Sequence, residues 1–579
     1  MSVSLSDEQH AYMKAIGKVI LNACPGSGKT TSVAHKLHFL IQNWKVNYNK
    51  TSGIACLSFT NVAKNEIAEK YKEISGSSLP SPHTILTIDS FVNSYITLPF
   101  AHKVKDVGKR YRIIDDMDHL RNILKSNWNL SRSFGSIIHR FDPSKIDLTA
   151  NGGFAWDGHD KSDDSEFVKY AQAVKKAQIE LGLLKTSDSA FLALNILKKY
   201  PRLAKYIAHK FPHLIIDEAQ DTSELQHSIL EILYNEGLKN IDLVGDPYQC
   251  LYQWRNASPQ LFLEKFDDKE KWNGIHLTEN RRSTKKIIDA FAVLRRNGEK
   301  SVVAINNSSS DLPVHVIKCN VSDYSAAIRK YEELCRAHNQ ECNNIIVRGN
   351  TLRNLLLGTD SDFSPWSNSI PYLLINSKIH LQSNEIKEAI RHARRITIEL
   401  SNPDISFSDR KEKENETKND KKFNGLIFNL IRDLPSFDLT IKEWTIQSQA
   451  YLKKALELVN EPDFGIRKKN TKTFDKGTLE NQVAKYFKKS TTDNNIPVTT
   501  IHQVKGMTFD SVFLILSSSS TGQNISLNDF VRAEEMPSEK QRLIYVAMSR
   551  PRTLLCVGVP DTVTDEVIRE KFGIEVLIL

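Results

Sequence analysis

The chain has 579 residues, which is enough for about three to five structural units. A net charge of +9, from 78 Lys+Arg against 69 Asp+Glu, suits a polyanionic partner without identifying one. None of the seven cysteines forms a Cys-x-x-Cys pair, no apolar run approaches about 18 residues, and no signal peptide is evident. These features argue against a zinc or iron–sulfur site and against a membrane span, so we expect a soluble, cytoplasmic protein.

The first motif combines a short apolar run, Val19–Leu21, with the segment ACPGSGKT and a helix-compatible stretch, Thr31–Leu40. A strand, a small-residue loop and a helix in this order are typical of a phosphate loop, in which backbone N–H groups and the helix N-terminus face phosphate oxygens. Lys29 would reach the β- and γ-phosphates, and Thr30 would bind Mg²⁺. A chance glycine turn before a helix is the alternative. The predicted loop consists of Ala23, Cys24, Pro25, Gly26, Ser27, Gly28, Lys29 and Thr30.

Short apolar segments predict the buried strands of a first α/β lobe. Between them, residues 99–204 are polar and mostly helical in pattern, and residues 151–164 are rich in Gly and Asp and are expected to form a loop. The predicted strands are Val19–Ala23, Gly53–Ser58, Leu214–Ile216 and Ile241–Val244.

The segment LIIDEAQD places two carboxylates, Asp217 and Glu218, where a buried strand ends. Ligands of open α/β sheets bind beyond the carboxyl ends of the strands. We therefore expect Asp217 to hold Mg²⁺ and Glu218 to orient or deprotonate the attacking water. The alternative is an acidic strand end that begins a helix.

A second lobe is expected from near Leu277, with strands at Ile345–Arg348, Asp510–Leu516 and Leu554–Val557. It is interrupted by residues 376–492, which contain the mixed-charge segment DRKEKENETKNDKK. That segment is interpreted as a solvated linker or frayed helix, with a binding tail as the alternative.

Further blocks complete an ordered set of motifs from residue 5 to residue 552. The set resembles the UvrD/Rep/PcrA branch of superfamily 1 helicases. In size and layout the chain also resembles the short helicases of anti-phage systems such as Gabija. The blocks are LSDEQ, LSFTNVA, VGDPYQCLYQWRNA, LTENRRS, VTTIHQVKGMTFD and EKQRLIYVAMSRPR.

The resemblance implies an α/β fold of two RecA-like P-loop lobes with parallel sheets, each interrupted by a mainly helical insertion. No room remains after the last motif for a fused nuclease domain, so we expect any nuclease to be a separate subunit. The implied boundaries are 1–98 and 205–276 for the first lobe, 99–204 for its insertion, 277–375 and 493–579 for the second lobe, and 376–492 for a compact second insertion.

The resemblance also assigns nucleotide contacts. Gln9 would read adenine, Gln249 would sense the γ-phosphate, and Arg282 and Arg550 would reach that phosphate from the second lobe. The implied catalytic residues are Lys29, Glu218, Gln249, Arg282 and Arg550.

Nucleoside recognition departs from the family pattern. Arg281 replaces a usual Tyr that stacks on adenine, Thr31 replaces a common Arg, and Thr508 replaces a Glu that contacts the ribose. Asp89, in the block TIDSF, replaces a usual His. We expect Arg281 and Thr31 to flank the base and ATP to be distinguished less sharply from other nucleotides.

For DNA, the resemblance implies base stacking by Phe59, Tyr252 and Trp254, a mode that tolerates any sequence. Phe59 and Trp254 also fit core positions. Backbone contacts are expected from Thr60, Asn61, Thr87, Thr500 and His502.

Taken together, these features predict an ATP- and Mg²⁺-dependent motor that moves 3′ to 5′ on single-stranded DNA and acts at single-strand/duplex junctions. It would serve repair, recombination or phage defence. The alternative is a nucleotide- and DNA-sensing regulatory subunit that controls a separate nuclease without processive unwinding.

Overall fold

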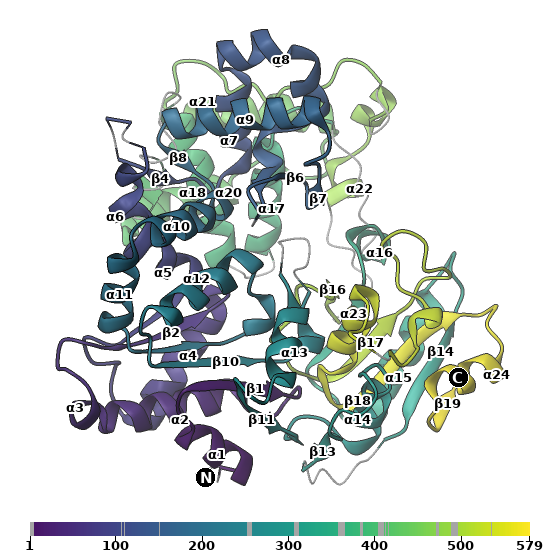
Figure 1. Cartoon of the computed structure of the whole chain (residues 1–579). Coiled ribbons are helices and arrows are strands. Elements are labelled where there is room, and N and C mark those ends of the chain that lie inside the picture. The colour runs from purple at the N-terminus through teal and green to yellow at the C-terminus, as the bar shows by residue number, and fades with distance from the viewer. Residues whose placement is uncertain are drawn as a thin grey trace. The chain divides into compact units, whose positions relative to one another are not determined.

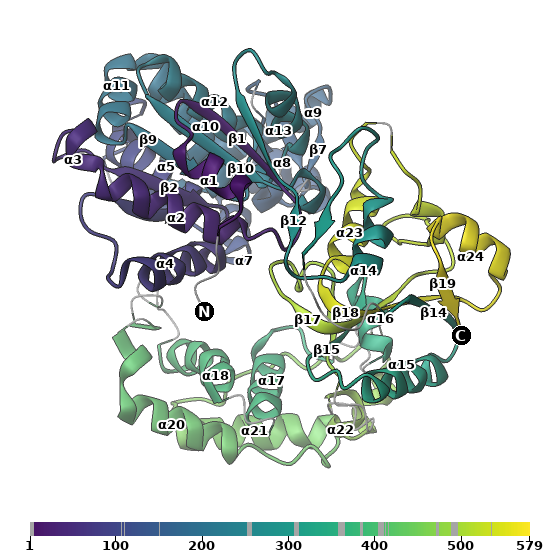
Figure 2. The same cartoon turned by 90° about the horizontal axis from the view of Figure 1, so that it is seen from below.

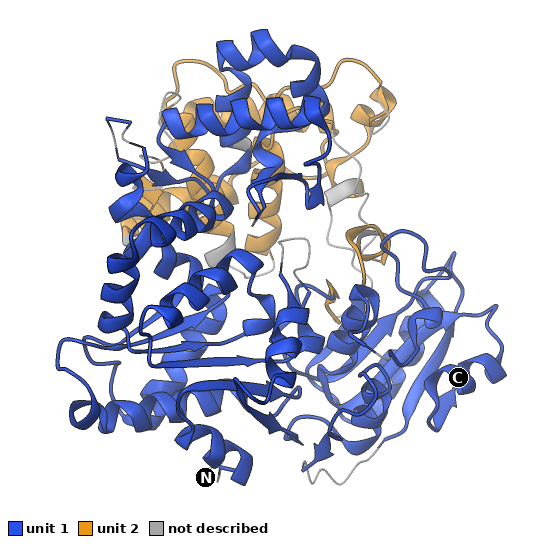
Figure 3. Ribbon diagram, viewed as in Figure 1, with its two compact units in different colours: residues 1–346, 501–579 blue, residues 347–500 orange. Residues whose placement is uncertain are grey.

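The computed structural model describes residues 5–579 apart from 106, 109, 150, 252–256, 306–311, 357–364, 383–385, 403–409, 411–412, 415, 471–473, 488–495 and 534. It divides into two compact units (Figure 3). One unit contains residues 1–346 and 501–579, and the other contains residues 347–500.

The first lobe is built on a parallel sheet, which confirms the four predicted strands. The strand order is β11 (Asn273–Leu277), β1 (Lys18–Ala23), β10 (Asn240–Gly245), β9 (His213–Ile216), β2 (Ile54–Ser58) and β3 (Thr84–Thr87).

Helices cover both faces of this sheet (Figures 1 and 2). Val19 and Leu21 of β1 pack in one apolar cluster, and Ile20 packs in another on the opposite face. Each large apolar side chain buried in this way stabilises the folded state by about 1.5–3 kcal/mol relative to leaving it exposed. One face carries α1 (Asp7–Lys14), α2 (Lys29–Gln42), α3 (Trp44–Asn47) and α4 (Asn61–Ser75), and the other carries α5 (Ile88–Val92), α10 (Thr186–Lys199), α11 (Pro201–Lys210), α12 (Glu224–Asn235) and α13 (Pro259–Asp267).

The segment 99–204 is mainly helical, as expected, but it also contains small sheets. The expected loop 151–164 in fact includes a hairpin of β6 (Phe154–Trp156) and β7 (His159–Asp160), whose turn places Asp157 and Gly158 at φ values of 51° and 82°. Two consecutive residues with positive φ match the twist of a tight hairpin, so the Gly and Asp residues mark a turn between strands. The other elements are α6 (Leu98–Phe100), α7 (Met117–Lys125), α8 (Trp128–Arg140), α9 (Ser165–Glu180), β4 (Arg112–Ile113) paired with β8 (Leu183–Leu184), and the antiparallel strands β5 (Ile146–Leu148), β6 (Phe154–Trp156) and β7 (His159–Asp160).

The second lobe contains another parallel sheet, so the α/β fold of two RecA-like lobes is confirmed. Its strands β15 (Asn343–Val347), β17 (Phe509–Ile515), β18 (Pro551–Pro560), β14 (Val314–Cys319) and β19 (Val576–Ile578) neighbour one another in that order. The lobe also contains α14 (Lys285–Ala292), α15 (Ser325–Ala337), α23 (Glu539–Met548), α24 (Asp565–Phe572) and the paired strands β12 (Glu279–Asn280) and β13 (Val303–Ala304).

The second compact unit is mainly helical and has its own core around Trp366 and Trp444. It spans 347–500, whereas the sequence suggested an insertion of 376–492. The unit begins earlier because α17 (Ile370–Gln382) packs with α18 (Ile386–Ser401) and α20 (Lys421–Arg432). Part of the mixed-charge segment lies outside the described residues, and α20 begins at Lys421. The helices are α16 (Asn350–Leu356), α17 (Ile370–Gln382), α18 (Ile386–Ser401), α20 (Lys421–Arg432), α21 (Ile441–Ala455) and α22 (Val483–Phe487), and strand β16 (Val498–Thr500) ends the unit.

Among the described residues of both units, no helix combines the length and the apolar character that crossing a bilayer would require.

Candidate active site

The loop between β1 and α2 is tied to the segment that opens the second lobe. The backbone N–H of Cys24 donates to the carbonyl of Leu277 at 3.0 Å, and that of Arg281 donates to the carbonyl of Gly26 at 3.0 Å. Gly26 has a φ of 69°, and a Cβ at this position would lie 2.6 Å from the Cβ of Arg282. Glycine is therefore required here for both backbone conformation and space.

At the end of β9, the structure brings Glu218 close to the phosphate-loop lysine. Lys29 Nζ lies 3.9 Å from Glu218 Oε1. Glu218 adopts a left-handed conformation with a φ of 54°, which costs about 1–3 kcal/mol for a residue other than glycine and is often found at functional sites.

The donor set fits a magnesium ion. Asp217 is 2 % exposed, and its Oδ1 has no hydrogen-bond partner among the described residues. An unpaired buried carboxylate oxygen is costly unless a cation binds it. With the hydroxyl of Thr30 at the start of α2, Asp217 offers the hard oxygen ligands that Mg²⁺ prefers.

The two adjacent carboxylates have opposite electrostatic environments. Burial, followed by the charge of Glu218, raises the pKa of Asp217 to about 7. Burial alone would raise the pKa of Glu218, but Lys29 and Lys505 outweigh it and lower that pKa to about 2. Glu218 is therefore ionised at neutral pH, as a proton acceptor must be.

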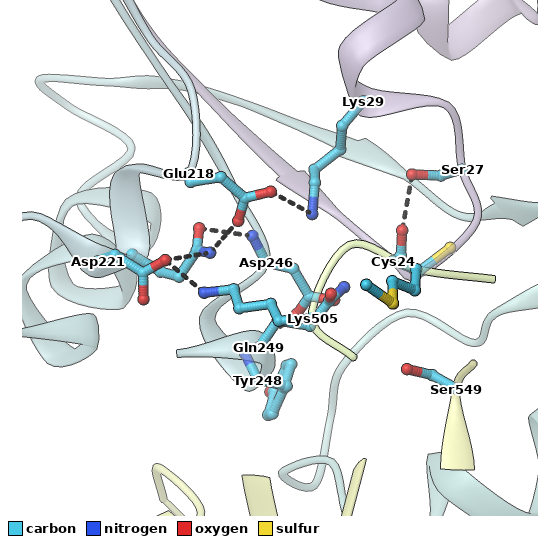
Figure 4. A network of polar contacts seen from close by, with 12 residues as sticks. Cys24, Ser27, Lys29, Glu218, Asp221, Asp246, Tyr248, Gln249, Lys505 and Ser549 are labelled. Atoms are coloured by element: carbon cyan, nitrogen blue, oxygen red, sulfur yellow. Dashed lines mark hydrogen bonds and ion pairs between the residues drawn. The ribbon is translucent and has the colours of Figure 1, made fainter. Parts of the chain in front are cut away.

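A chain of hydrogen bonds leads away from Glu218 through residues that the sequence analysis did not select (Figure 4). Gln220 Nε2 donates to Glu218, and Gln220 Oε1 accepts from the backbone N–H of Asp246 at 3.1 Å. The carboxylate of Asp246 accepts from Gln249 Nε2 at 2.6 Å. Gln220 lies in the motif DEAQD and Asp246 in the motif VGDPYQC. Their place inside these motifs was the sequence feature that could have identified them as site residues.

The second lobe completes this chain. Arg550 Nη2 donates to Gln249 Oε1 at 2.8 Å, and Arg282 Nη1 donates to the carbonyl of Ser549 at 3.1 Å. Lys505 forms an ion pair with Asp221. Lys29, Glu218, Gln249 and Arg550 thus join one polar network.

The two arginines lie in a site that favours an anion. Burial and the charge of Arg282 lower the pKa of Arg550 to about 9, and burial lowers that of Arg282 to about 10. Two guanidinium groups that repel each other in a desolvated site would be stabilised by a phosphate.

The predicted base-reading residues also lie near the loop. Gln9 is 4 % exposed, and its Nε2 donates to Ser32 Oγ at 3.0 Å. Arg281 Nη2 pairs with Glu279 Oε2 at 2.9 Å, and Thr31 lies half-buried in the first turn of α2.

Several predicted DNA contacts share the carboxyl edge of the first sheet, since Ser58 and Thr87 are paired in register at the ends of β2 and β3. Phe59 is half-buried there, and Asn61 is exposed. The hydroxyl oxygens of Thr60 and Thr87 accept backbone N–H groups that begin α4 and α5, both at 3.1 Å.

The other predicted DNA contacts are Thr500, His502, Tyr252 and Trp254. His502 is half-buried in the first unit, and Thr500 ends β16 in the second unit. Tyr252 and Trp254 lie outside the described residues.

Two family models match the chain. The UvrD/REP helicase N-terminal domain matches residues 5–270, and the UvrD-like helicase C-terminal domain matches residues 408–560. The ATP-dependent DNA helicase PcrA of Staphylococcus epidermidis is 23% identical, with 95% of this chain and 82% of the relative aligned. The ATP-dependent DNA helicase PcrA of Staphylococcus aureus has the same identity and coverage. The order of motifs, the paired α/β lobes and these matches show that the chain belongs to the UvrD/REP helicase family.

Proposed function

We propose that this protein is an ATP-dependent DNA helicase that moves 3′ to 5′ on single-stranded DNA, and that its hydrolytic site is the network around Lys29, Glu218, Gln249 and Arg550. The observation that carries the proposal is the hydrogen bond from Arg550 of the second lobe to Gln249 of the first. It connects the two lobes at the predicted γ-phosphate position.

In the proposed reaction, the backbone of the phosphate loop and Lys29 bind the phosphates of ATP. Lys29 now lies 3.9 Å from Glu218, so phosphate binding would compete with that carboxylate for the ammonium group. Glu218 then orients the attacking water and accepts its proton. Lys29 and Lys505 keep the carboxylate ionised beforehand, and its pKa rises towards that of a useful base as Lys29 turns to the phosphates.

Arg550 and Arg282 stabilise negative charge on the transferred phosphoryl group, and Gln249 links the position of Arg550 to the first lobe. Thr30 and Asp217 would hold Mg²⁺, which neutralises charge on the phosphate oxygens. Because phosphate binds groups from both lobes, ATP favours their approach and hydrolysis releases it.

The DNA part of the proposal is supported by PcrA, whose name states a DNA helicase activity, and by the excess of positive charge. Phe59, Thr60, Asn61 and Thr87 lie at the carboxyl edge of the first sheet, which suits contacts with a single strand. Stacking and phosphate contacts would allow movement without sequence preference.

The test uses the purified full chain with ATP and Mg²⁺. We expect single-stranded DNA to stimulate hydrolysis, and partial duplexes with a 3′ single-stranded tail to be unwound faster than those with a 5′ tail. Lys29→Ala is the inactive control. Hydrolysis without strand separation on either substrate would contradict the helicase proposal and favour a nucleotide-sensing regulatory role, and equal unwinding from both tails would contradict the direction.

A further inference from the structure

A charged cluster with no exposed side chain lies between α1, α2 and the central strands of the first sheet. Asp242 of β10 pairs with Lys36 of α2 at 2.7 Å, and both side chains are 0 % exposed. Asp242 Oδ2 also lies 3.3 Å from His213 Nε2 of β9 and accepts a hydrogen bond of 3.3 Å from the hydroxyl of Tyr12 of α1. The cluster therefore joins the helix of the predicted base reader, the helix of the phosphate loop and two central strands.

Lys36 holds α1 by two further contacts. Its ammonium donates to the carbonyl of Ala15, at the C-terminal end of α1, at 2.8 Å. It also lies 4.3 Å from the centroid of the Tyr12 ring, within the range of a cation–π interaction. The ammonium group of Lys36 therefore contacts three partners: the carboxylate of Asp242, the carbonyl of Ala15 and the face of the Tyr12 ring.

The contacts between α1 and α2 form two successive rungs. In the first rung, Gln9 Nε2 donates to Ser32 Oγ at 3.0 Å. In the second rung, Tyr12 lies over Lys36. Because Gln9 and Tyr12 are three residues apart, and Ser32 and Lys36 four, each pair shares one helix face. The position of Tyr12 along α2 therefore sets the position of the Gln9 amide.

α1 depends on such anchors. It has eight residues, and a helix this short is not stable by its own hydrogen bonds. Burial alone would raise the pKa of Asp242, but Lys36 and His213 hold it below its ordinary value, so the carboxylate stays ionised and keeps its partners at neutral pH.

We infer that Tyr12, Lys36 and Asp242 are positioning residues for nucleotide choice: they fix the amide of Gln9 so that it recognises adenine and disfavours guanine. The inference rests on the proposed nucleotide site and adds the residues that determine its base preference. None of the three belongs to the predicted phosphate loop or to the network around Glu218. Their effect therefore falls on the affinity for one base and leaves the hydrolytic step unchanged.

The test begins with Tyr12→Phe, which removes one hydroxyl and keeps the ring over Lys36. Equilibrium binding of fluorescent ATP and GTP analogues with Mg²⁺ is measured first, and then KM and kcat with single-stranded DNA. We expect about 3- to 10-fold weaker binding of ATP, because a poorly held Gln9 amide loses a contact worth about one hydrogen bond to adenine. GTP binding and kcat should be unchanged. Tyr71→Phe is the matched control, because Tyr71 is a buried tyrosine of the same apolar cluster outside the charged group. It should leave the ATP-to-GTP ratio unchanged.

Gln9→Ala and the double variant Gln9→Ala/Tyr12→Phe separate positioning from general stability. If Tyr12 acts through Gln9, the double variant binds ATP no more weakly than Gln9→Ala alone. Lys36→Met/Asp242→Leu removes the buried pair without leaving a single charge, and it should reduce the ATP preference at least as much as Tyr12→Phe.

Three results would overturn the inference: a Tyr12→Phe protein with the wild-type ATP-to-GTP binding ratio, additive losses in the double variant, or a wild-type protein that binds ATP and GTP equally. Absence of DNA-stimulated hydrolysis in the wild type would instead refute the proposed function, while the binding ratios would still decide the role of Tyr12.

Discussion

Replacing Arg550 by alanine tests whether the contact between the lobes serves hydrolysis. Arg550 is 1 % exposed and donates to Gln249 Oε1 at 2.8 Å and to the carbonyl of Val546 at 2.9 Å. An inserted arginine usually contributes about 10³–10⁵-fold to kcat in phosphoryl transfer, or roughly 4–7 kcal/mol. We therefore expect Arg550→Ala to lower kcat by about 10³-fold or more.

The cost to folding is smaller and can be worked out separately. Gln249 Oε1 loses its donor from Arg550, which costs about 1–3 kcal/mol if the acceptor stays buried. The carbonyl of Val546 keeps a second donor, Ser549 Oγ at 3.0 Å. The melting temperature should therefore fall by only a few degrees, and the protein assayed should be folded.

The assay is steady-state ATPase with saturating single-stranded DNA, together with thermal melting. Arg552→Ala is the matched control, since Arg552 lies two residues further along the chain, in β18, with 57 % of its side chain exposed, and pairs with Asp510 at 3.3 Å. An exposed pair of this kind is worth about 0–1 kcal/mol, so kcat should remain within about fivefold of the wild type. A folded Arg550→Ala protein with kcat within about tenfold of the wild type, well short of the usual arginine contribution, would refute the reasoning.

The remaining predictions concern four other residues. Glu218→Gln should keep ATP binding and lose turnover, because an amide cannot accept the proton; near-normal DNA-stimulated ATPase in this variant would show that another group is the base. Arg281→Tyr should tighten ATP binding by restoring a flat ring where Arg281 now pairs with Glu279, and a wild-type kcat/KM for ATP several orders of magnitude above that for GTP would contradict the weaker discrimination expected. Burial lowers the pKa of His227 from 6.5 to about 3, so the unfolded chain binds a proton between these pH values that the folded chain does not. Stability is therefore lost as pH falls through this window, by roughly 2 kcal/mol at pH 5, and His227→Leu should flatten the melting temperature between pH 7 and pH 5, whereas parallel curves would exclude this cause. Trp254→Ala should weaken single-stranded DNA binding by about 1–3 kcal/mol and uncouple ATPase from DNA, and an early-melting variant that keeps normal DNA stimulation would identify Trp254 as structural.

The sequence by itself determined the class of fold and the nucleotide motifs. Strands buried on both faces are continuous apolar runs, so β1, β2, β9 and β10 could be found without knowing their partners. The phosphate loop and the carboxylates Asp217 and Glu218 are also local signals. The loop comes immediately after β1 in the sequence, and the two carboxylates come immediately after β9.

The tertiary structure alone decided which distant residues meet. Gln220 bonds with Asp246, and Asp242 with Lys36 and Tyr12, because of the order of strands in the first sheet and the helices packed on it. Gln249 bonds with Arg550 because the two lobes meet there. Side-chain periodicity reports which face of an element is buried but not which element covers it. The role of a charged residue inside a strand, such as Asp242, cannot be predicted from the sequence until its partner is known. A buried carboxylate is tolerated only when a cation from another element pairs with it, as Lys36 does here.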